Sequence, residues 1–141
     1  MSTMFDTSTA PGADAIRHMR EDVVAWLTTV APDGTPQSSI VCFFWDGESI
    51  VTYSRPGAPK VANIRANPRV CFHLNSDEYG NHMVTIEGTA RIDTSAPPTD
   101  QVPAYLAKHR RPYEVWGMDP HRTAEDFSLA LRITPDRVRV W

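Results

Sequence analysis

The sequence has few cysteines, no surplus of basic charge and no long apolar run. Its two cysteines, Cys42 and Cys71, lie in apolar strand-like segments, which predicts small buried thiols in the reduced state rather than a disulfide framework. Lys and Arg total 14 against 17 Asp and Glu, a formal net charge of −3, unlike the basic footprint of a duplex-binding protein. No segment approaches the roughly 18 apolar residues of a membrane span, and the first residues do not resemble a signal peptide. We therefore expect a cytoplasmic protein that binds neither nucleic acid nor a membrane.

Common catalytic and metal-binding motifs are also missing. The chain contains no GxSxG, HExxH, CxxC or GxGxxG. Its five histidines share no ligand spacing, so no metal ligand is predicted. His73 and His82 flank one loop, where two hydrogen-bonded or solvated imidazoles are a better interpretation than a site. The catalytic residues stay unknown at this stage.

The length and composition are typical of one globular domain. The chain has 141 residues, of which 41% are hydrophobic and 22% charged, enough to form a sizeable core. We predict a single domain over residues 1–141. Residues 1–11 are polar and contain Pro11, which favours a flexible lead-in.

The first half of the chain has the pattern of an antiparallel meander. Strand-like runs at 23–31, 36–45 and 49–54 are separated by short turns containing Gly34 and Gly47. Connections this short exclude parallel neighbours, which need a crossover of about a dozen residues. Further strands are predicted at 69–75, 82–93 and 127–141, the last as one strand or a pair, and Gly88 predicts a bulge. Helices are predicted at 12–22, 60–65, 99–113 and 120–126.

The run at 40–45 is apolar on both faces of its strand. The two faces carry Ile40, Cys42 and Phe44 on one side and Val41, Phe43 and Trp45 on the other. One face can line a barrel interior. The other needs a cover, which a twofold partner subunit, an aromatic ligand or a packed helix would supply.

Positive charge is concentrated in one segment. No acidic residue occurs between Glu48 and Asp77, whereas four basic residues do: Arg55, Lys60, Arg65 and Arg69. This segment includes the start of a predicted helix, where backbone N–H groups favour an anion such as phosphate. Four solvated surface charges are the alternative interpretation.

An ordered set of segments resembles the flavin- and deazaflavin-binding split-barrel proteins related to pyridoxamine 5′-phosphate oxidase. The segments are DGTPQSSIV at 33–41, DG at 46–47, YSR at 53–55, KVANI at 60–64 and NPRV at 67–70. The opening from Phe5 and the run DQVPAYLAKHR at 100–110 resemble an actinobacterial branch described as coenzyme F420-dependent oxidoreductases.

The resemblance implies a fold and a function. The expected fold is mainly β, a six-stranded antiparallel split β-barrel of the FMN-binding type with peripheral helices. The expected assembly is a homodimer with cofactors at the interface, which would cover Val41, Phe43 and Trp45. The expected function is an F420H2-dependent oxidoreductase that transfers a hydride to an electron-poor small organic substrate. An FMN-dependent oxidase or reductase and a non-catalytic cofactor-binding or storage protein are the alternatives.

The resemblance also implies where the cofactor, coenzyme F420 or alternatively FMN, would bind. The phosphate is expected near Ser54, Arg55, Lys60 and Asn63, and the ring edge along Gln37, Ser38, Ser39, Ile40 and Val41. Lys60 and Asn63 match the family pattern most directly, whereas the loop after Arg55 departs from it. Arg65 or Arg69 would extend the positive potential toward the acidic tail of F420. Candidate walls of the substrate pocket are Trp45, Trp116 and Tyr79.

Overall fold

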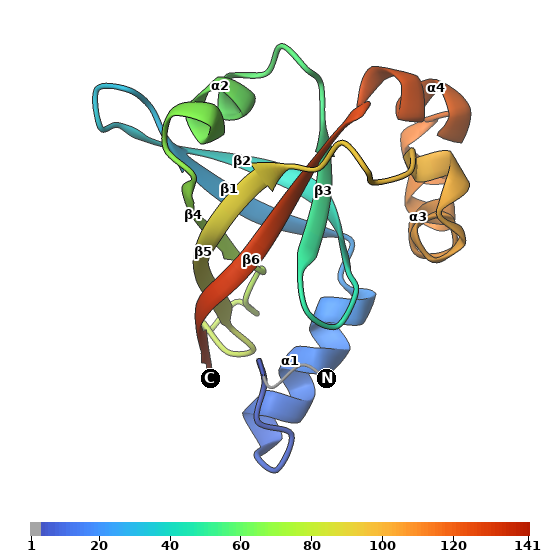
Figure 1. The fold of residues 1–141 in the computed structure, drawn as a ribbon. Helices are drawn as coiled ribbons and strands as arrows, with labels where there is room; N and C mark the ends of the chain where they lie inside the picture. The colour runs from blue at the N-terminus through green and yellow to red at the C-terminus, as the bar shows by residue number, and fades with distance from the viewer. Residues whose placement is uncertain (1–3) are drawn as a thin grey trace.

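In the computed structural model, which describes residues 4–141, six antiparallel strands close into a barrel in the order β1-β2-β3-β6-β5-β4 (Figure 1). The strands are β1 (Val24–Val30), β2 (Pro36–Trp45), β3 (Ile50–Ser54), β4 (Arg69–His73), β5 (Val84–Ile92) and β6 (Leu129–Val140). The helices are α1 (Ala10–Glu21), α2 (Pro59–Ala66), α3 (Pro103–Trp116) and α4 (Pro120–Asp126), with a 3₁₀ turn at Thr99–Gln101. The predicted mainly β architecture with peripheral helices is confirmed.

Short turns build the meander of β1, β2 and β3 that the sequence predicts. Val30 lies opposite Pro36 across the first hairpin, and Trp45 lies opposite Ile50 across the second. Gly34 and Gly47 have φ angles of 88° and 98°, in the left-handed region that glycine adopts without steric cost. The turn residues therefore set the antiparallel register of this half of the barrel.

The predicted bulge at Gly88 is confirmed, because the register between β5 and β6 shifts between Glu87 and Gly88. A Cβ atom at Gly88 would lie 2.3 Å from the carbonyl oxygen of Thr134, so only glycine allows the two backbones to approach this closely. The last segment is one strand rather than a pair. β6 runs for 12 residues and pairs with both β3 and β5, which closes the barrel.

The face of β2 that lines the barrel interior is the one that the resemblance assigned to a partner subunit. Val41, Phe43 and Trp45 are buried and belong to the hydrophobic core. The opposite face is partly open, and Ile40 is 56% exposed. The expectation that a dimer covers Val41, Phe43 and Trp45 is therefore wrong. An alternating pattern defines two faces, but the closure of the barrel decides which one is inside.

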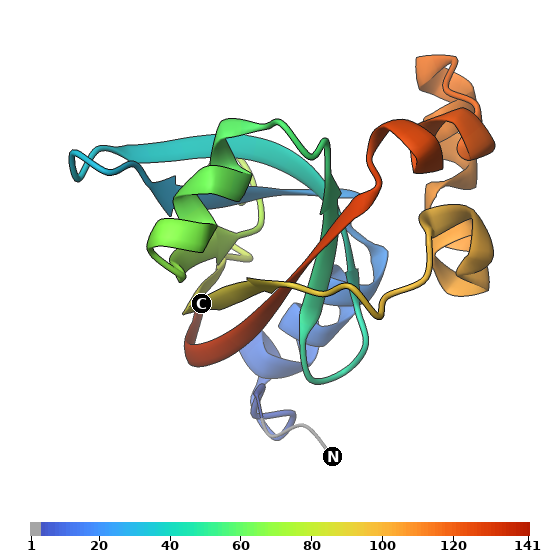
Figure 2. The same cartoon turned by 45° about the horizontal axis from the view of Figure 1, so that its top comes forward.

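Two helices cover the two ends of the barrel, and two lie along its side. Figure 1 shows α1 near one end and α2 near the other, whereas α3 and α4 lie together beside the barrel in Figures 1 and 2. Phe5 and Met19 are buried in the core cluster, and the Thr9 hydroxyl accepts a hydrogen bond from the Gly12 N–H at 3.1 Å. This cap lets α1 begin at Ala10, inside the segment where a lead-in is predicted. Residues 1–3 of that segment lie outside the described residues.

The third helix begins later than predicted. Thr99 opens only the short 3₁₀ turn, and α3 starts at Pro103 and continues to Trp116, where Gly117 ends it in the left-handed conformation. The prediction for α4 is confirmed, because the Asp119 side chain accepts a hydrogen bond from the Arg122 N–H at 2.9 Å. Across residues 4–141, no helix combines the length and apolarity needed to cross a bilayer.

Candidate functional site

A cavity of about 250 Å³ lies where the outer face of β2 meets β3, the start of α2 and the α3–α4 pair. Its lining residues are mostly apolar or aromatic: Val24, Ile40, Val41, Cys42, Tyr53, Lys60, Thr99, Tyr105, Tyr113, Trp116, Met118, Thr123 and Phe127. Three predicted cofactor-binding residues, Ile40, Val41 and Lys60, thus meet at one cavity, together with Trp116, one of the predicted walls.

Lys60 provides the positive charge of this cavity. It is the second residue of α2, it is half-buried, and burial lowers the pKa of its ammonium group. It forms no ion pair with any residue from Met4 to Trp141. The first turn of α2 contains no acidic residue, and its N-cap, Ala58, has no capping side chain. A partly desolvated cation at an uncapped helix start favours an anionic ligand.

Asn63 fixes the position of α2 and does not line the cavity. Its buried amide donates hydrogen bonds to Thr29 Oγ1 at 3.0 Å and to Gln37 Oε1 at 2.8 Å. Because both partners belong to the β1–β2 hairpin, this amide ties α2 to the barrel wall. It places Lys60, one turn earlier on the same helix, at the cavity.

The other predicted site residues lie outside the cavity lining. Ser38 shares a hydrogen bond of 2.6 Å with the Thr28 hydroxyl, and Ser39 follows it on the same strand. Ser54 is buried, and its hydroxyl donates to the carbonyl oxygen of Arg55 at 2.9 Å. Lys60 is therefore the basic residue that lines this cavity.

Two of the predicted arginines are engaged with side chains of the protein. The Arg55 guanidinium carbon lies 4.6 Å from the ring centroid of Phe127, which lines the cavity. Arg69 forms an ion pair with Asp136. Arg65 is exposed on the last turn of α2. Of the two arginines considered for the acidic tail, Arg69 is therefore paired within the protein, whereas Arg65 forms no ion pair with the described residues.

Trp116 was the one part of the aromatic wall supplied by α3 that the sequence analysis named, and Tyr105 and Tyr113 were missed. The Tyr105 and His109 rings stack with centroids 4.0 Å apart, and the Tyr105 and Tyr113 hydroxyls lie 3.2 Å apart. Burial raises the pKa of Tyr105 and lowers that of His109 to about 4. The signal was present, because Tyr105, His109 and Tyr113 recur at intervals of four, the spacing of one helix face.

The cavity also contains a polar group without a partner. Thr99 is 2% exposed, and its hydroxyl has no hydrogen-bond partner within the described part of the chain. A buried hydroxyl left unpaired costs about 1–3 kcal/mol. A polar ligand bound in the cavity would supply the missing hydrogen-bond partner.

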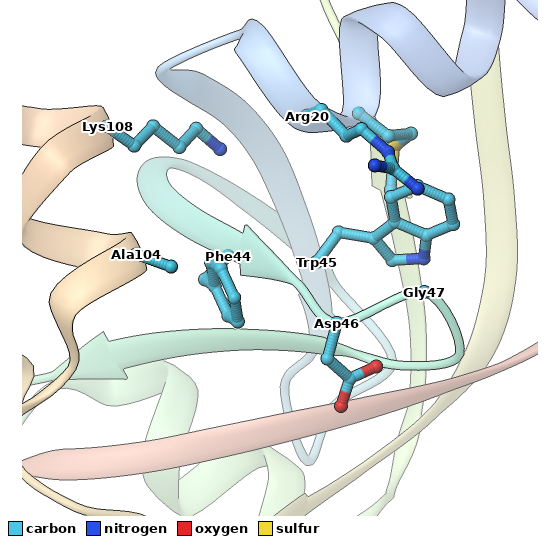
Figure 3. Close-up of a pocket in the computed structure, with 8 residues that line it drawn as sticks. Arg20, Phe44, Trp45, Asp46, Gly47, Ala104 and Lys108 are labelled. Carbon is cyan, nitrogen blue, oxygen red and sulfur yellow. The ribbon is translucent and has the colours of Figure 1, made fainter.

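A second cavity, of about 410 Å³, lies between α1, the β2–β3 turn and α3 (Figure 3). Lys108 reaches toward it from α3, and Arg20 lies 5.5 Å from the ring centroid of Trp45. The Lys108 ammonium donates a hydrogen bond to the Phe43 carbonyl at 2.8 Å, and burial lowers its pKa to about 8. None of the predicted cofactor-binding residues lines this cavity. Of the other predicted walls, Trp45 lines it, whereas Tyr79 is 81% exposed.

Comparison with known proteins decides the family. Residues 13–141 match the family model described as Pyridoxamine 5′-phosphate oxidase. The chain belongs to this family. The split-barrel resemblance seen in the sequence is therefore confirmed. No curated protein matches the chain.

Several solved structures share the fold of this chain. An F420 reductase is 24% identical, with a TM-score of 0.66 over 87% of this chain and 94% of that one. HutZ, the heme storage protein from Vibrio cholerae, is 19% identical, with a TM-score of 0.62 and coverage of 89% and 91%. A FAD-binding protein from Mesorhizobium loti is 18% identical, with a TM-score of 0.62 and coverage of 92% and 91%. Proteins of this fold thus carry names that refer to different ligands.

Proposed function

We propose that this protein is an F420H2-dependent oxidoreductase that binds its cofactor in the Lys60 cavity. The observation that carries the proposal is a half-buried lysine, unpaired within the described residues, that opens onto an aromatic-lined cavity. Burial destabilises the charged form of the Lys60 ammonium group. An anion bound beside it would stabilise that charged form again. A phosphorylated heterocyclic cofactor supplies both an anion and an aromatic surface.

The residues around the cavity fit such a cofactor. Lys60 and the start of α2 would hold the phosphate, and the Thr99 hydroxyl would find a polar partner. Tyr105 and Trp116 offer aromatic surface that excludes water. When bound, a reduced deazaflavin supplies a hydride from ring carbon C5 to an electron-poor carbon of a second substrate. The chain itself would contribute orientation and exclusion of water.

Three observations favour the deazaflavin over FMN. The branch that the sequence resembles is described by its use of coenzyme F420, and a structural neighbour is named an F420 reductase. Arg65 lies exposed on the last turn of α2, beyond Lys60, where it would meet the acidic tail that FMN lacks. An FMN-dependent enzyme is the second candidate, because FMN also presents a phosphate and a tricyclic ring, and a neighbour of the same fold is named as a protein that binds the related flavin FAD.

We also propose that a second copy of the chain completes the site. The cavity is smaller than the roughly 300–1,000 Å³ of a typical ligand pocket. Ile40 and Trp116, which line it, are 56% and 45% exposed, and neighbouring Val115 is 64% exposed. A twofold partner seated on this apolar face would enclose the ligand and shield these side chains. Ile40→Glu should then yield monomers in light scattering, and a dimer retained by this variant would contradict the arrangement.

The binding proposal is tested by titrating the purified protein with F420 and FMN side by side, following fluorescence. We expect tighter binding of F420. Lys60→Met should weaken it roughly 10- to 150-fold through loss of one charge-assisted contact. Lys108→Met is the matched control, because Lys108 is the other lysine of the sequence and lies at the second cavity. Unchanged affinity in Lys60→Met would remove this lysine from the site.

Turnover is tested separately from binding. Stopped-flow oxidation of bound reduced F420 by a panel of enones and quinones should reveal an acceptor that reacts much faster than the others. Uniform rates limited by solvent would instead support a storage protein, a role with a precedent in the fold because one neighbour is a heme storage protein.

A further inference from the structure

A cluster of metal-ligand side chains lies near α1, away from the Lys60 cavity. Asp14 and His18 come from α1, and His82 comes from the loop between β4 and β5. Their potential ligand atoms all lie within 4.8 Å of one another. Figure 1 shows α1 and α2 near opposite ends of the barrel, so the cluster is separate from the proposed cofactor site.

Hydrogen bonds already orient the two imidazoles toward the shared carboxylate. His18 Nδ1 lies 2.9 Å from Asp22 Oδ1, which leaves Nε2 directed to Asp14 Oδ2 at 3.6 Å. His82 Nδ1 lies 2.5 Å from the same Asp14 oxygen. A carboxylate on the far nitrogen of a ligating histidine is the usual outer partner in metal sites, because it fixes the tautomer and raises the basicity of the ligand.

The spacing is close to that of a coordination sphere. Ligand atoms about 2.0–2.1 Å from one tetrahedral ion lie roughly 3.3 Å apart. The distance from His18 Nε2 to Asp14 Oδ2 is 3.6 Å, close to this value, and His82 would withdraw from Asp14 by less than about 1 Å to match it. The ligand atoms of the third pair, His18 and His82, lie within 4.8 Å of each other. His82 is half-exposed on a loop, so this small displacement disturbs no packed core.

We infer that Asp14, His18 and His82 form a binding site for one divalent first-row transition ion of the zinc class, with a further position open to solvent. Two imidazole nitrogens and one carboxylate oxygen suit such ions, and they suit Mg²⁺ or Ca²⁺ poorly. The ion would tie α1 to the β4–β5 loop, two segments that are far apart in the sequence.

Hydrogen bonds within the β4–β5 loop hold the segment that carries His82 beside α1. The Asp77 carboxylate accepts hydrogen bonds from the Tyr79 and Asn81 N–H groups at 2.9 and 2.8 Å. These contacts organise the turn just before His82. Asp14 and His82 are 68 positions apart, which is why spacing along the sequence does not show the cluster.

Arg17 competes with the ion for the same ligands. One guanidinium nitrogen lies 2.6 Å from Asp14 Oδ1 and 3.2 Å from His18 Nε2. The side chain is 52% exposed and has a second partner, Glu21, at 3.5 Å, so it can move aside. Removal of this positive charge should therefore tighten metal binding.

The site is tested by calorimetric titration of the full, tag-free chain with ZnCl2, and by visible absorption after addition of CoCl2. We expect one ion per chain. His18→Ala and His82→Asn should each weaken binding by more than about 100-fold, and Asp22→Asn by roughly 10- to 100-fold. Arg17→Ala should bind more tightly than the original protein. His121→Ala is the matched control, because His121 pairs with Asp100 outside the cluster and should leave affinity unchanged.

Thermal unfolding distinguishes a variant that has lost a metal-binding side chain from one that no longer folds. Without metal, His82→Asn should melt within a few degrees of the original chain, because the contact with Asp14 that it loses involves a half-exposed side chain and contributes about 1 kcal/mol or less. With zinc, the original chain, Arg17→Ala and the His121→Ala control should gain several degrees, whereas His18→Ala and His82→Asn should not. Absence of zinc binding by the original chain would overturn the inference. Full affinity in His82→Asn, or an equal loss in His121→Ala, would overturn it as well.

Discussion

Asn63 donates a hydrogen bond of 2.8 Å to the side-chain oxygen of Gln37, 26 positions earlier in the chain. The same amide donates to Thr29, so one side chain joins α2 to two strands of the barrel. Lys60 belongs to the same helix. The position of the cationic group at the cavity therefore depends on a buried amide that does not itself line the cavity.

Asn63→Ala should destabilise the protein by about 2–3 kcal/mol, because it leaves buried Thr29 without its donor and also removes the hydrogen bond to Gln37. Urea unfolding measures the change. Gln37→Ala, at an exposed residue, should cost about 1 kcal/mol or less. A double-mutant cycle should give a coupling of about 0.5–1.5 kcal/mol, and strict additivity would show that this hydrogen bond contributes nothing.

Thr99→Val should stabilise the ligand-free protein by about 1 kcal/mol or more. The valine keeps the shape of the side chain and removes the hydroxyl that has no partner within residues 4–141. Cofactor affinity should fall at the same time if the hydroxyl is retained for binding. Thr123→Val, at another buried threonine of the cavity, is the comparison. A stability gain without loss of affinity would assign Thr99 no role in binding.

Stability should fall as the solution is acidified through the range set by His109. Burial lowers the pKa of this imidazole from 6.5 to about 4, so between these values the unfolded chain binds a proton that the folded chain does not. The stability present above pH 6.5 is then lost progressively toward pH 4, by roughly 2–3 kcal/mol.

Denaturant unfolding of His109→Phe across the same pH range checks this assignment. The phenylalanine keeps an aromatic ring between Tyr105 and Tyr113 and has no proton to gain. Its stability should therefore depend less on pH over this interval. Equal slopes for the two proteins would mean that other groups cause the acid sensitivity.

Lys108 should give a pH dependence of the same sign, but at alkaline pH. Burial lowers the pKa of its ammonium from 10.5 to about 8, so between these values the unfolded state binds more protons than the folded state. Stability should rise with pH over this window, by about 1–2 kcal/mol once solvent screening of the partly exposed group is included. The measurement compares unfolding of the protein with that of Lys108→Met, which should lack this rise. The same slope in both would place the proton exchange elsewhere.

Much of the barrel was predictable because its signals are local. The turns at Gly34 and Gly47 have backbone angles that favour glycine, and the bulge at Gly88 needs a residue without a Cβ. Asp119 caps α4 through its own side chain. Each of these features depends on a few neighbouring residues, so the sequence alone contains the information.

The candidate site was predictable only in part. The cluster of positive charge pointed to Lys60, and the structure places this residue at a cavity. Clustering of charge along the sequence could not show that Lys60 lines a cavity whereas Arg69 forms an ion pair with Asp136. The spacing of Tyr105, His109 and Tyr113 can be read from the sequence and indicates one helix face. The surface against which that face packs cannot be read from it.

The sequence by itself determined where strands, turns and caps occur, since these follow from side-chain periodicity and backbone preferences within short segments. Only the tertiary structure decided that Val41 and Phe43 point into the barrel, that Lys60 is half-buried, and that His82 meets Asp14. These outcomes depend on barrel closure and on contacts between distant segments. A pattern with a period of two residues specifies two faces and leaves open which one turns inward.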